Sequence, residues 1–120
     1  MGILESKLKE QLLLAVPREI PNLRIFVRDI GVGRALHGNQ VISFGVAGQF
    51  DTWAIVKGTS RHIEIELKSL SGRVRPEQKV WAAFCAAWGI PHVILKPLAG
   101  ETVEQTIKRW CAELRAVVAQ

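Results

Sequence analysis

The feature that most constrains the fold is an alternating segment in the middle of the chain. Residues 50–69, FDTWAIVKGTSRHIEIELKS, hold two β-rich runs on either side of Gly58 and Thr59. This pattern is typical of a β-hairpin, and glycine at the first central position suits a two-residue type II′ turn. Side chains alternate along a strand, so one face of the second run is apolar and goes to a core. The other face carries His62, Glu64, Glu66 and Lys68.

The predicted turn fixes which residues of the two strands face each other. Lys57 pairs with Ser60, and the same register places Asp51 directly opposite Glu66, with Cβ atoms about 4.5 to 5.5 Å apart. Two carboxylates at this separation repel each other, and a divalent cation reverses that repulsion. Mg²⁺ in phosphoryl chemistry uses such carboxylates together with water and a substrate phosphate. Lys68 shares this face, where it is placed to act on an attacking water or on transition-state charge.

A purely structural interpretation of the same pattern stays open. An Asp opposite a Glu-x-Lys strand is also what a solvated sheet face looks like when a lysine neutralises two acids. A register shift of one residue would in addition move Asp51 away from Glu66.

Length and composition predict one domain, 1–120, in a cytoplasmic protein. A chain of 120 residues is long enough to bury a core without disulfides or a metal. Cys85 and Cys111 lack the spacing of a metal or disulfide site and are expected to be buried free thiols. No segment resembles a signal peptide or has the length of a membrane span, so no membrane partner is expected. The net charge of +5 favours polyanionic partners such as nucleic acid.

The rest of the chain predicts an α/β fold. Residues 3–15 have helical periodicity that Pro17 ends, and residues 22–50 look extended with a turn-rich middle. A helix beginning at Pro76 and ending at Gly89 precedes a short strand at 91–97 and a final helix at 101–119. This order predicts a mixed sheet, with an antiparallel hairpin pair and a parallel pair joined by a right-handed helical crossover. The core is expected to include Trp81, Trp88 and Trp110, with Val80, Phe84 and Cys85 on the same helical stripe as the first two.

Several polar residues near the charged strand have two interpretations each. Basic residues in the following loop and helix turn are well placed for phosphate contacts, although a solvated basic patch has the same pattern. These are Arg73, Arg75 and Lys79. Gln78 is placed to orient Lys68 or a phosphate, or is simply a solvated helix start. Glu5, with Glu10 as the second choice, enters the site from the first helix or only complements the helix dipole.

Taken together, these segments resemble the VRR-NUC family, a branch of the PD-(D/E)xK nuclease superfamily. The resemblance runs from Glu5 to about Pro97, and its motifs occur in the family's order. The matching segments are ESKLKEQLLL with Glu5, RDIG with Arg28 and Gly31, GQFD with Asp51, ELK with Glu66 and Lys68, and GRVRPEQKVW with Gln78. Each motif alone is weak, whereas the set is fairly specific. Two departures are Phe50 in place of proline and Arg75 in place of a serine N-cap, which frees Arg75 to face phosphate.

The resemblance implies a fold, an activity and a set of residue roles. The fold is a restriction-endonuclease-like mixed β-sheet core flanked by helices, and the activity is Mg²⁺- or Mn²⁺-dependent endonucleolytic hydrolysis of DNA. Asp51, Glu66 and the main-chain carbonyl of Leu67 would ligate the metal. Lys68 would act on the nucleophilic water, assisted by Glu5 and Gln78. Arg28 would join Arg73, Arg75 and Lys79 as a DNA-binding residue.

The family's stand-alone domains, often phage-encoded, further imply a homodimer that cuts four-way (Holliday) junctions in a bacterial or phage-infected host cell. Two symmetric nicks need two active sites related by a twofold axis. The first helix, the last helix and the VISFGV strand are open choices for the dimer interface. No small-molecule cofactor is expected. The alternatives are a non-catalytic basic DNA-binding module and a general duplex endonuclease or nickase.

Overall fold

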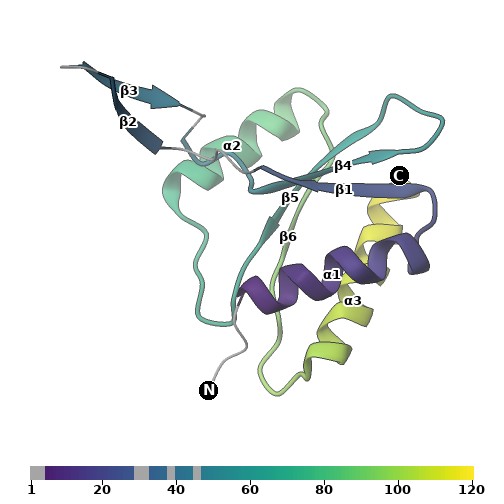
Figure 1. The fold of residues 1–120 in the computed structure, drawn as a ribbon. Coiled ribbons are helices and arrows are strands. Elements are labelled where there is room, and N and C mark those ends of the chain that lie inside the picture. Colours follow the sequence, from purple (N-terminus) through teal and green to yellow (C-terminus); the bar gives the residue numbers. More distant parts are fainter. Residues whose placement is uncertain (1–4, 29–32, 38–39, 45–46) are drawn as a thin grey trace.

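The structure is a computed structural model that describes the backbone of residues 5–28, 33–37, 40–44 and 47–120, and the side chains of residues 5–28 and 47–120. The elements are α1 (Glu5–Glu19), β1 (Leu23–Val27), β2 (Gly33–His37), β3 (Gln40–Phe44), β4 (Thr52–Val56), β5 (His62–Leu67), α2 (Pro76–Ala87), β6 (His92–Leu95) and α3 (Val103–Val118). Strands β1, β4, β5 and β6 form one sheet in that order, and β2 pairs with β3 in a separate two-stranded sheet (Figure 1).

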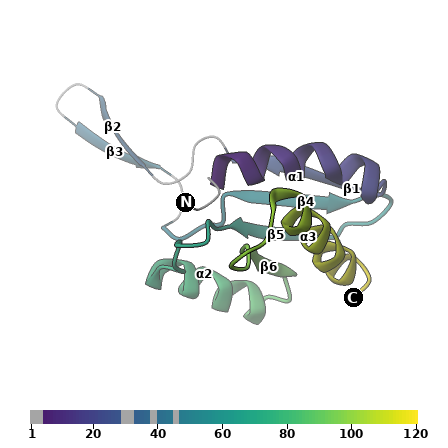
Figure 2. The same ribbon diagram turned by 90° about the horizontal axis from the view of Figure 1, so that it is seen from below.

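The four-stranded sheet is mixed and has helices on both faces. Its β1–β4 and β4–β5 pairs are antiparallel, and the β5–β6 pair, joined through α2, is parallel. Helices α1 and α2 lie on opposite sides of this sheet (Figure 2). These observations confirm the predicted α/β fold with a mixed sheet, an antiparallel hairpin and a parallel pair.

The predicted register of the β4–β5 hairpin is confirmed, but its turn is longer than expected. Thr52 is paired with Ile65 and Trp53 with Glu64, which puts Asp51 beside Glu66. Residues 57–60 form the loop: the Val56 N–H donates to the Arg61 carbonyl at 3.2 Å, and Gly58 has a φ of 77°. A four-residue loop adds one residue to each side of a two-residue turn. The strand register is therefore the same for both.

The first helix and the segment after β1 differ from the sequence prediction. Helix α1 passes through Pro17 and ends at Glu19. Proline removes one main-chain donor, but the Ile20 N–H still donates to the Val16 carbonyl at 2.8 Å and both side chains are buried. The expected turn-rich segment contains strand β2, paired with β3. Residues 29–32, 38–39 and 45–46 lie outside the described part of the chain.

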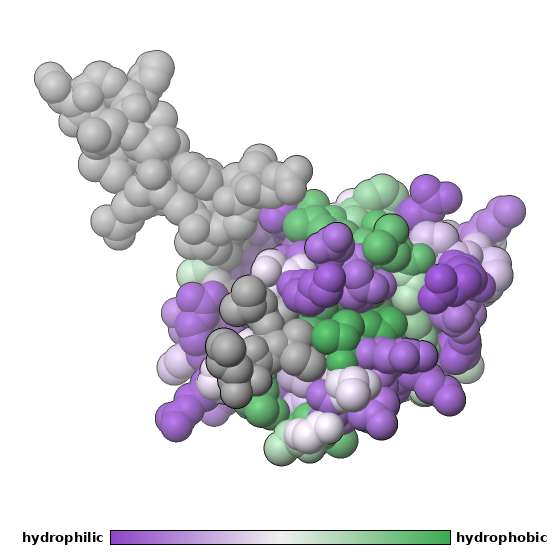
Figure 3. All heavy atoms as spheres, turned by 60° about the horizontal axis from the view of Figure 1, so that its bottom comes forward, coloured by the Kyte–Doolittle hydropathy of each residue, from purple (hydrophilic) through white to green (hydrophobic). Residues whose placement is uncertain are grey.

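The main core lies between the sheet and helices α1 and α3. It combines the inward side chains of β4 and β5 with apolar residues of the two helices, including Leu8, Leu12, Trp110 and Leu114. The opposite, outer side of these helices holds a groove of about 760 Å³. Its lining mixes exposed Leu14 with Lys7 and Lys108, and Figure 3 shows apolar side chains between hydrophilic ones on this side of the molecule. No described helix combines the length and hydropathy that a membrane crossing requires.

Helix α2 overturns one prediction about the core. Trp110 is fully buried, and Cys85 and Cys111 are buried free thiols, as expected. Trp88, however, is 73% exposed, and Val80 and Phe84 are exposed with it. The reason is that α2 packs on the charged face of the sheet. It buries Gln78 and Cys85 there, and its apolar stripe faces outward.

The two tryptophans should therefore differ sharply in their contribution to stability. We expect Trp110→Ala to lower the free energy of unfolding by about 3–5 kcal/mol, because it empties a core site. Trp88→Ala should change it by no more than about 0.5 kcal/mol, as for most surface substitutions. Urea unfolding of both variants measures this, and equal losses would mean that the α2 stripe is buried in solution.

Candidate functional site

Glu66 is the centre of a buried polar network at the end of β5. Its side chain is 5% exposed. Glu66 Oε1 accepts a hydrogen bond from the Asp51 main-chain N–H at 3.1 Å, and Glu66 Oε2 accepts one from Gln78 Nε2 at 3.0 Å. Lys68 Nζ lies 3.4 Å from Glu66 Oε2. The strand alternation predicted from sequence therefore does bring Asp51, Glu66 and Lys68 together.

Gln78 connects helix α2 to this network. Its Oε1 accepts hydrogen bonds from Lys68 Nζ at 2.7 Å and from the Arg75 main-chain N–H at 3.0 Å. Because Arg75 is the N-cap residue of α2, Gln78 closes the helix start and also orients the lysine. At 1% exposure Gln78 is not part of a solvated helix start, so that alternative is wrong.

Close contact between two chain segments holds the start of α2 against the Asp51 loop. Gly48 has a φ of 80°, and a Cβ at this position would lie only 2.0 Å from the Glu77 carbonyl oxygen. Only glycine fits both that backbone conformation and that space. The segment that leads into Asp51 can therefore pass directly over the first turn of α2, beside Gln78.

Asp51 has one paired and one unpaired carboxylate oxygen. Its Oδ2 forms an ion pair with Lys9 Nζ at 2.9 Å, whereas Oδ1 is buried and has no hydrogen-bond partner. The main chain is fixed at the same point, because the Arg28 N–H donates to the Asp51 carbonyl at 2.9 Å. An unpartnered buried carboxylate oxygen is costly, and it is the feature of this site that calls for a further donor or a cation.

The raised pKa of Glu66 is a second indication that the site calls for a further positive charge. Burial raises the pKa of Glu66 above its ordinary value, and the neighbouring charge of Asp51 raises it further. The Asp51 N–H and the Lys68 ammonium lower this pKa, but they do not outweigh the first two causes. The folded protein therefore disfavours the ionised form of Glu66 unless another positive charge is present.

These side chains border a cavity of about 290 Å³. Its lining includes Asp51, Glu66, Gln78, Arg28 and Arg75. Among the described side chains, no three His, Cys, Asp or Glu residues gather as a ready-made ion site. Mg²⁺ is commonly held by one or two protein carboxylates and completes its shell with water and substrate phosphate. Asp51 and Glu66 both line the cavity and one Asp51 oxygen has no partner, which fits that mode of binding.

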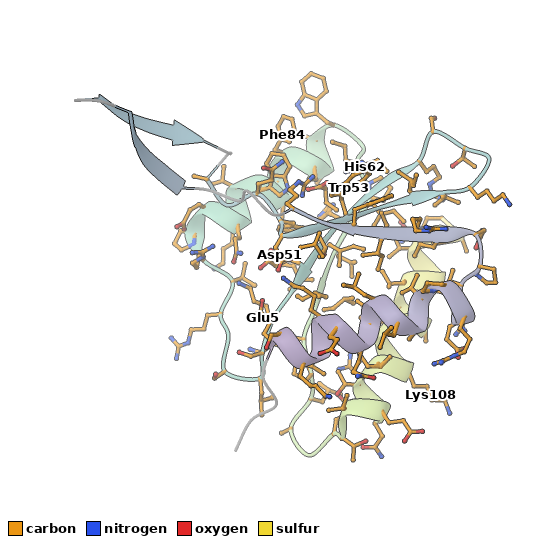
Figure 4. All side chains as sticks on the ribbon, viewed as in Figure 1. Glu5, Asp51, Trp53, His62, Phe84 and Lys108 are labelled. Carbon is orange, nitrogen blue, oxygen red and sulfur yellow. The ribbon has the colours of Figure 1, made fainter. Side chains whose placement is uncertain are left out.

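The remaining residues of the expected site are placed less directly. Glu5 is the first residue of α1 and shares a helix face with Lys9, four residues on, which reaches Asp51. Figure 4 shows Glu5 at the helix end beneath Asp51. Glu10 is exposed, so Glu5 is the better placed of the two acids. Leu67 ends β5 beside Glu66 with its side chain in the core, and metal ligation by its carbonyl stays a prediction.

Arg28 has a structural partner that sequence reasoning did not foresee. Its guanidinium donates to both Glu64 carboxylate oxygens, at 2.9 and 2.7 Å, and also to the Phe50 carbonyl. Trp81 Nε1 donates to Glu64 at 3.1 Å, and the His62 ring contacts the same carboxylate. Glu64 is therefore a structural partner of Arg28. This clamp anchors the residue that precedes Asp51.

One of the other predicted phosphate contacts lines the cavity. Arg73, Arg75 and Lys79 are all exposed, and Arg75 is the one that belongs to the cavity lining. Arg28 also lines the cavity, but its guanidinium is held by Glu64 and is less free to bind a phosphate. DNA contact by these four residues stays a prediction.

Sequence reasoning missed Lys9 and Trp81 as neighbours of the site. Lys9 is one of several lysines along α1, and no local signal separates it from the others. Its link to Asp51 depends on how α1 packs on the sheet. Trp81 was expected in the core, whereas its indole N–H caps the Glu64 carboxylate.

Comparison of the chain with protein-family models, with curated proteins and with solved structures finds no match. The resemblance to VRR-NUC nucleases therefore stays a prediction, carried by the motifs and by the geometry described above.

Removing Arg28 should destabilise the fold in a pH-dependent way. Burial alone would raise the pKa of Glu64, but hydrogen bonds and charges from Arg28 and His62 outweigh it and lower the pKa below 4.5. This pairing stabilises the folded state above the unfolded pKa and is lost as the pH falls through the folded value. We expect Arg28→Ala to cost about 3–5 kcal/mol at pH 7, because it leaves a buried carboxylate unpaired.

The difference between wild type and Arg28→Ala should shrink as the pH falls through the lowered pKa of Glu64, because the protonated carboxyl no longer needs the charge of Arg28. Denaturant unfolding at several pH values measures it. Arg24→Ala, which removes an exposed arginine of the neighbouring strand β1, is the matched control. A loss independent of pH would contradict the electrostatic origin of the clamp.

Proposed function

We propose that this protein is a metal-dependent DNA endonuclease of the VRR-NUC type, with a restriction-endonuclease-like core. The single observation that carries the proposal is the buried Glu66–Lys68–Gln78 network, which the Asp51 main-chain N–H joins at Glu66, in a site where Asp51 and Glu66 both line a cavity and one Asp51 oxygen has no partner. Such a set gains little as structure, because burial and mutual repulsion disfavour its ionised form. Phosphodiester hydrolysis with Mg²⁺ or Mn²⁺ gives each member a role.

The proposed roles follow from the contacts. Asp51 and Glu66, with the Leu67 carbonyl, would hold the ion, which when bound neutralises phosphate charge and favours ionisation of water. Lys68 points its ammonium to Gln78 and Glu66, and this fixed position suits it to orient the water that attacks phosphorus. Gln78 holds Lys68 in place, and Glu5 assists from α1. The water oxygen would form a new P–O bond and give up a proton, the P–O bond to the leaving oxygen would break, and that oxygen would take up a proton.

Charge and exposure support DNA as the substrate. The chain carries +5, and exposed Arg73, Arg75 and Lys79 lie between the end of β5 and the first turns of α2, with Arg75 in the cavity lining. These side chains would contact phosphates and position the DNA without reading its sequence. We extend the proposal to branched DNA, with a four-way junction as the first choice and a homodimer as the active form.

Two alternative functions can be distinguished from this proposal by experiment. A non-catalytic DNA-binding module would bind branched DNA and never cut it. A general duplex endonuclease or nickase would cut linear duplex and branched DNA at similar rates. Incubation of the protein with a labelled four-way junction and a matched linear duplex, in Mg²⁺, Mn²⁺ or EDTA, separates the three.

Substitutions in the network should remove cutting and spare binding. We expect Asp51→Asn and Lys68→Ala to lower the single-turnover cleavage rate at least about 100-fold, since each removes charge from the reacting centre. Junction affinity in EDTA should stay within about threefold of wild type, because phosphate contacts come from other residues. Glu5→Gln should reduce the cleavage rate, with exposed Glu10→Gln as the matched control. Wild-type cutting by Asp51→Asn or Lys68→Ala would refute the proposal.

Metal binding should also be visible without DNA. The raised pKa of Glu66 means that the folded state loses stability as the pH rises above the ordinary value of 4.5. A cation that binds both ionised carboxylates reverses this loss, and at 100 times its Kd it adds about 2.7 kcal/mol. We expect Mn²⁺ to raise Tm at pH 7 and to have little effect at pH 4.

Asp51→Asn should abolish the rise in Tm with Mn²⁺, and Glu10→Gln should preserve it. An equal rise in Asp51→Asn would show that the ion binds elsewhere on the protein.

A further inference from the structure

Two stacks of aromatic rings contact Glu64, the acid two residues before Glu66 on β5. On the sheet, Trp53 stacks between Phe26 and His62, with ring centroids 4.6 and 5.2 Å apart. On α2, Phe84 lies between Trp81 and Trp88, at 5.3 and 5.7 Å. We call these six rings the aromatic surface. Figure 4 shows its members Trp53, His62 and Phe84 on the same part of the molecule.

The buried Glu64 carboxylate joins the two stacks. His62 contacts it from the sheet stack and Trp81 Nε1 donates to it from the helix stack, at 3.1 Å. Trp53 is also the cross-strand neighbour of Glu64. Arg28 holds the same carboxylate, so His62 and Trp81 both contact a buried, charged side chain that is itself held in place. The outer rings, Phe84 and Trp88, project from α2 and are exposed.

Two of the elements that carry the aromatic rings also carry exposed cations. Exposed Arg24 lies on β1 opposite Ile55, and exposed Lys79 lies in the first turns of α2. Glu64 and Glu66, the acidic residues of β5, are buried, which leaves Glu77 as the exposed acid among the described residues of β1, β4, β5, β6 and α2. Exposed rings on elements that also carry cations are complementary to nucleic-acid bases and phosphates together, and paired bases cannot offer their faces to such rings.

We propose that the aromatic surface binds an unpaired strand of nucleic acid by stacking bases on Trp88 and Phe84. The inference extends the proposed function, because it adds a single-stranded segment to the DNA substrate. Glu64 and Glu66 are two residues apart on β5, about 7 Å along the strand. From Gln78 to Trp88 the helix rises about 15 Å. A strand that leaves the cavity along α2 therefore reaches Trp88 within a few nucleotides.

Binding is measured in EDTA, so cutting plays no part. The probe is a fluorescently labelled oligothymidine of about ten nucleotides, within the usual site sizes for stacking platforms. Fluorescence anisotropy gives its Kd for wild type and for Trp88→Ala, Phe84→Ala and Leu14→Ala. Leu14 is exposed on the opposite side of the sheet and serves as the matched apolar control.

Trp88→Ala and Phe84→Ala should each weaken oligothymidine binding roughly 5- to 100-fold, the range seen when a stacking ring is removed. Leu14→Ala should leave the Kd unchanged. Trp88→Phe keeps a ring and should stay close to wild type, whereas Trp88→Leu keeps apolar area without a ring and should behave like Trp88→Ala. A matched blunt duplex should lose little affinity in any of these variants.

Unchanged oligothymidine binding by both Trp88→Ala and Phe84→Ala would overturn the inference. Retention of binding by Trp88→Leu would also overturn it. So would a lower mass of Trp88→Ala than of wild type in sedimentation, because this would assign the aromatic surface to contact with a second copy of the chain. Every measurement of this inference is made in EDTA, where no strand is cut. The nuclease proposal therefore fails through cutting alone, and the present inference fails through binding alone.

Discussion

The antiparallel register between β4 and β5 is the constraint on which the rest of the structure depends. It sends Ala54, Ile63 and Ile65 into the core and, through the same alternation, turns Glu64 and Glu66 toward α2. A shift of one residue would exchange these faces and bury acids among the leucines of α1 and α3. The apolar core and the carboxylate site are thus two consequences of one pairing, and neither can move without the other.

Sequence reasoning found the parts of the site that arise from local pattern. Strand alternation and a hairpin of symmetric length are enough to place Asp51 beside Glu66 and Lys68, even though the turn itself is four residues long. Gln78 was within reach of the same argument, because a polar residue in the first turn of a helix that follows the charged strand must lie near the strand end. Lys9 and the Arg28–Glu64 clamp depend on packing between distant segments, for which one sequence carries no signal.

Helix α2 shows why periodicity alone misjudged the core. A stripe of Val80, Phe84 and Trp88 has the spacing of a buried face, yet the face turned to the sheet carries Gln78, Trp81 and Cys85. The polar network decides the orientation, because Glu64 and Glu66 would each lose a hydrogen-bond donor from α2 if the apolar stripe faced them. Trp81 and Gln78 satisfy these two acids, and rotation of α2 would lose both hydrogen bonds.

The structural alternative for the charged strand required a solvated face on which a lysine neutralises two acids. Glu64, Glu66 and Lys68 are all buried, so their charged forms lose the hydration that a solvated face would provide. Glu64 is well compensated, with a lowered pKa and a bidentate arginine. Glu66 is not: its pKa is raised, and Asp51 beside it keeps an unpartnered oxygen. The pKa values of these two acids on one strand face are thus shifted in opposite directions. Glu64 is a structural anchor, whereas the ionised form of Glu66 lacks compensating positive charge and would be stabilised by a cation.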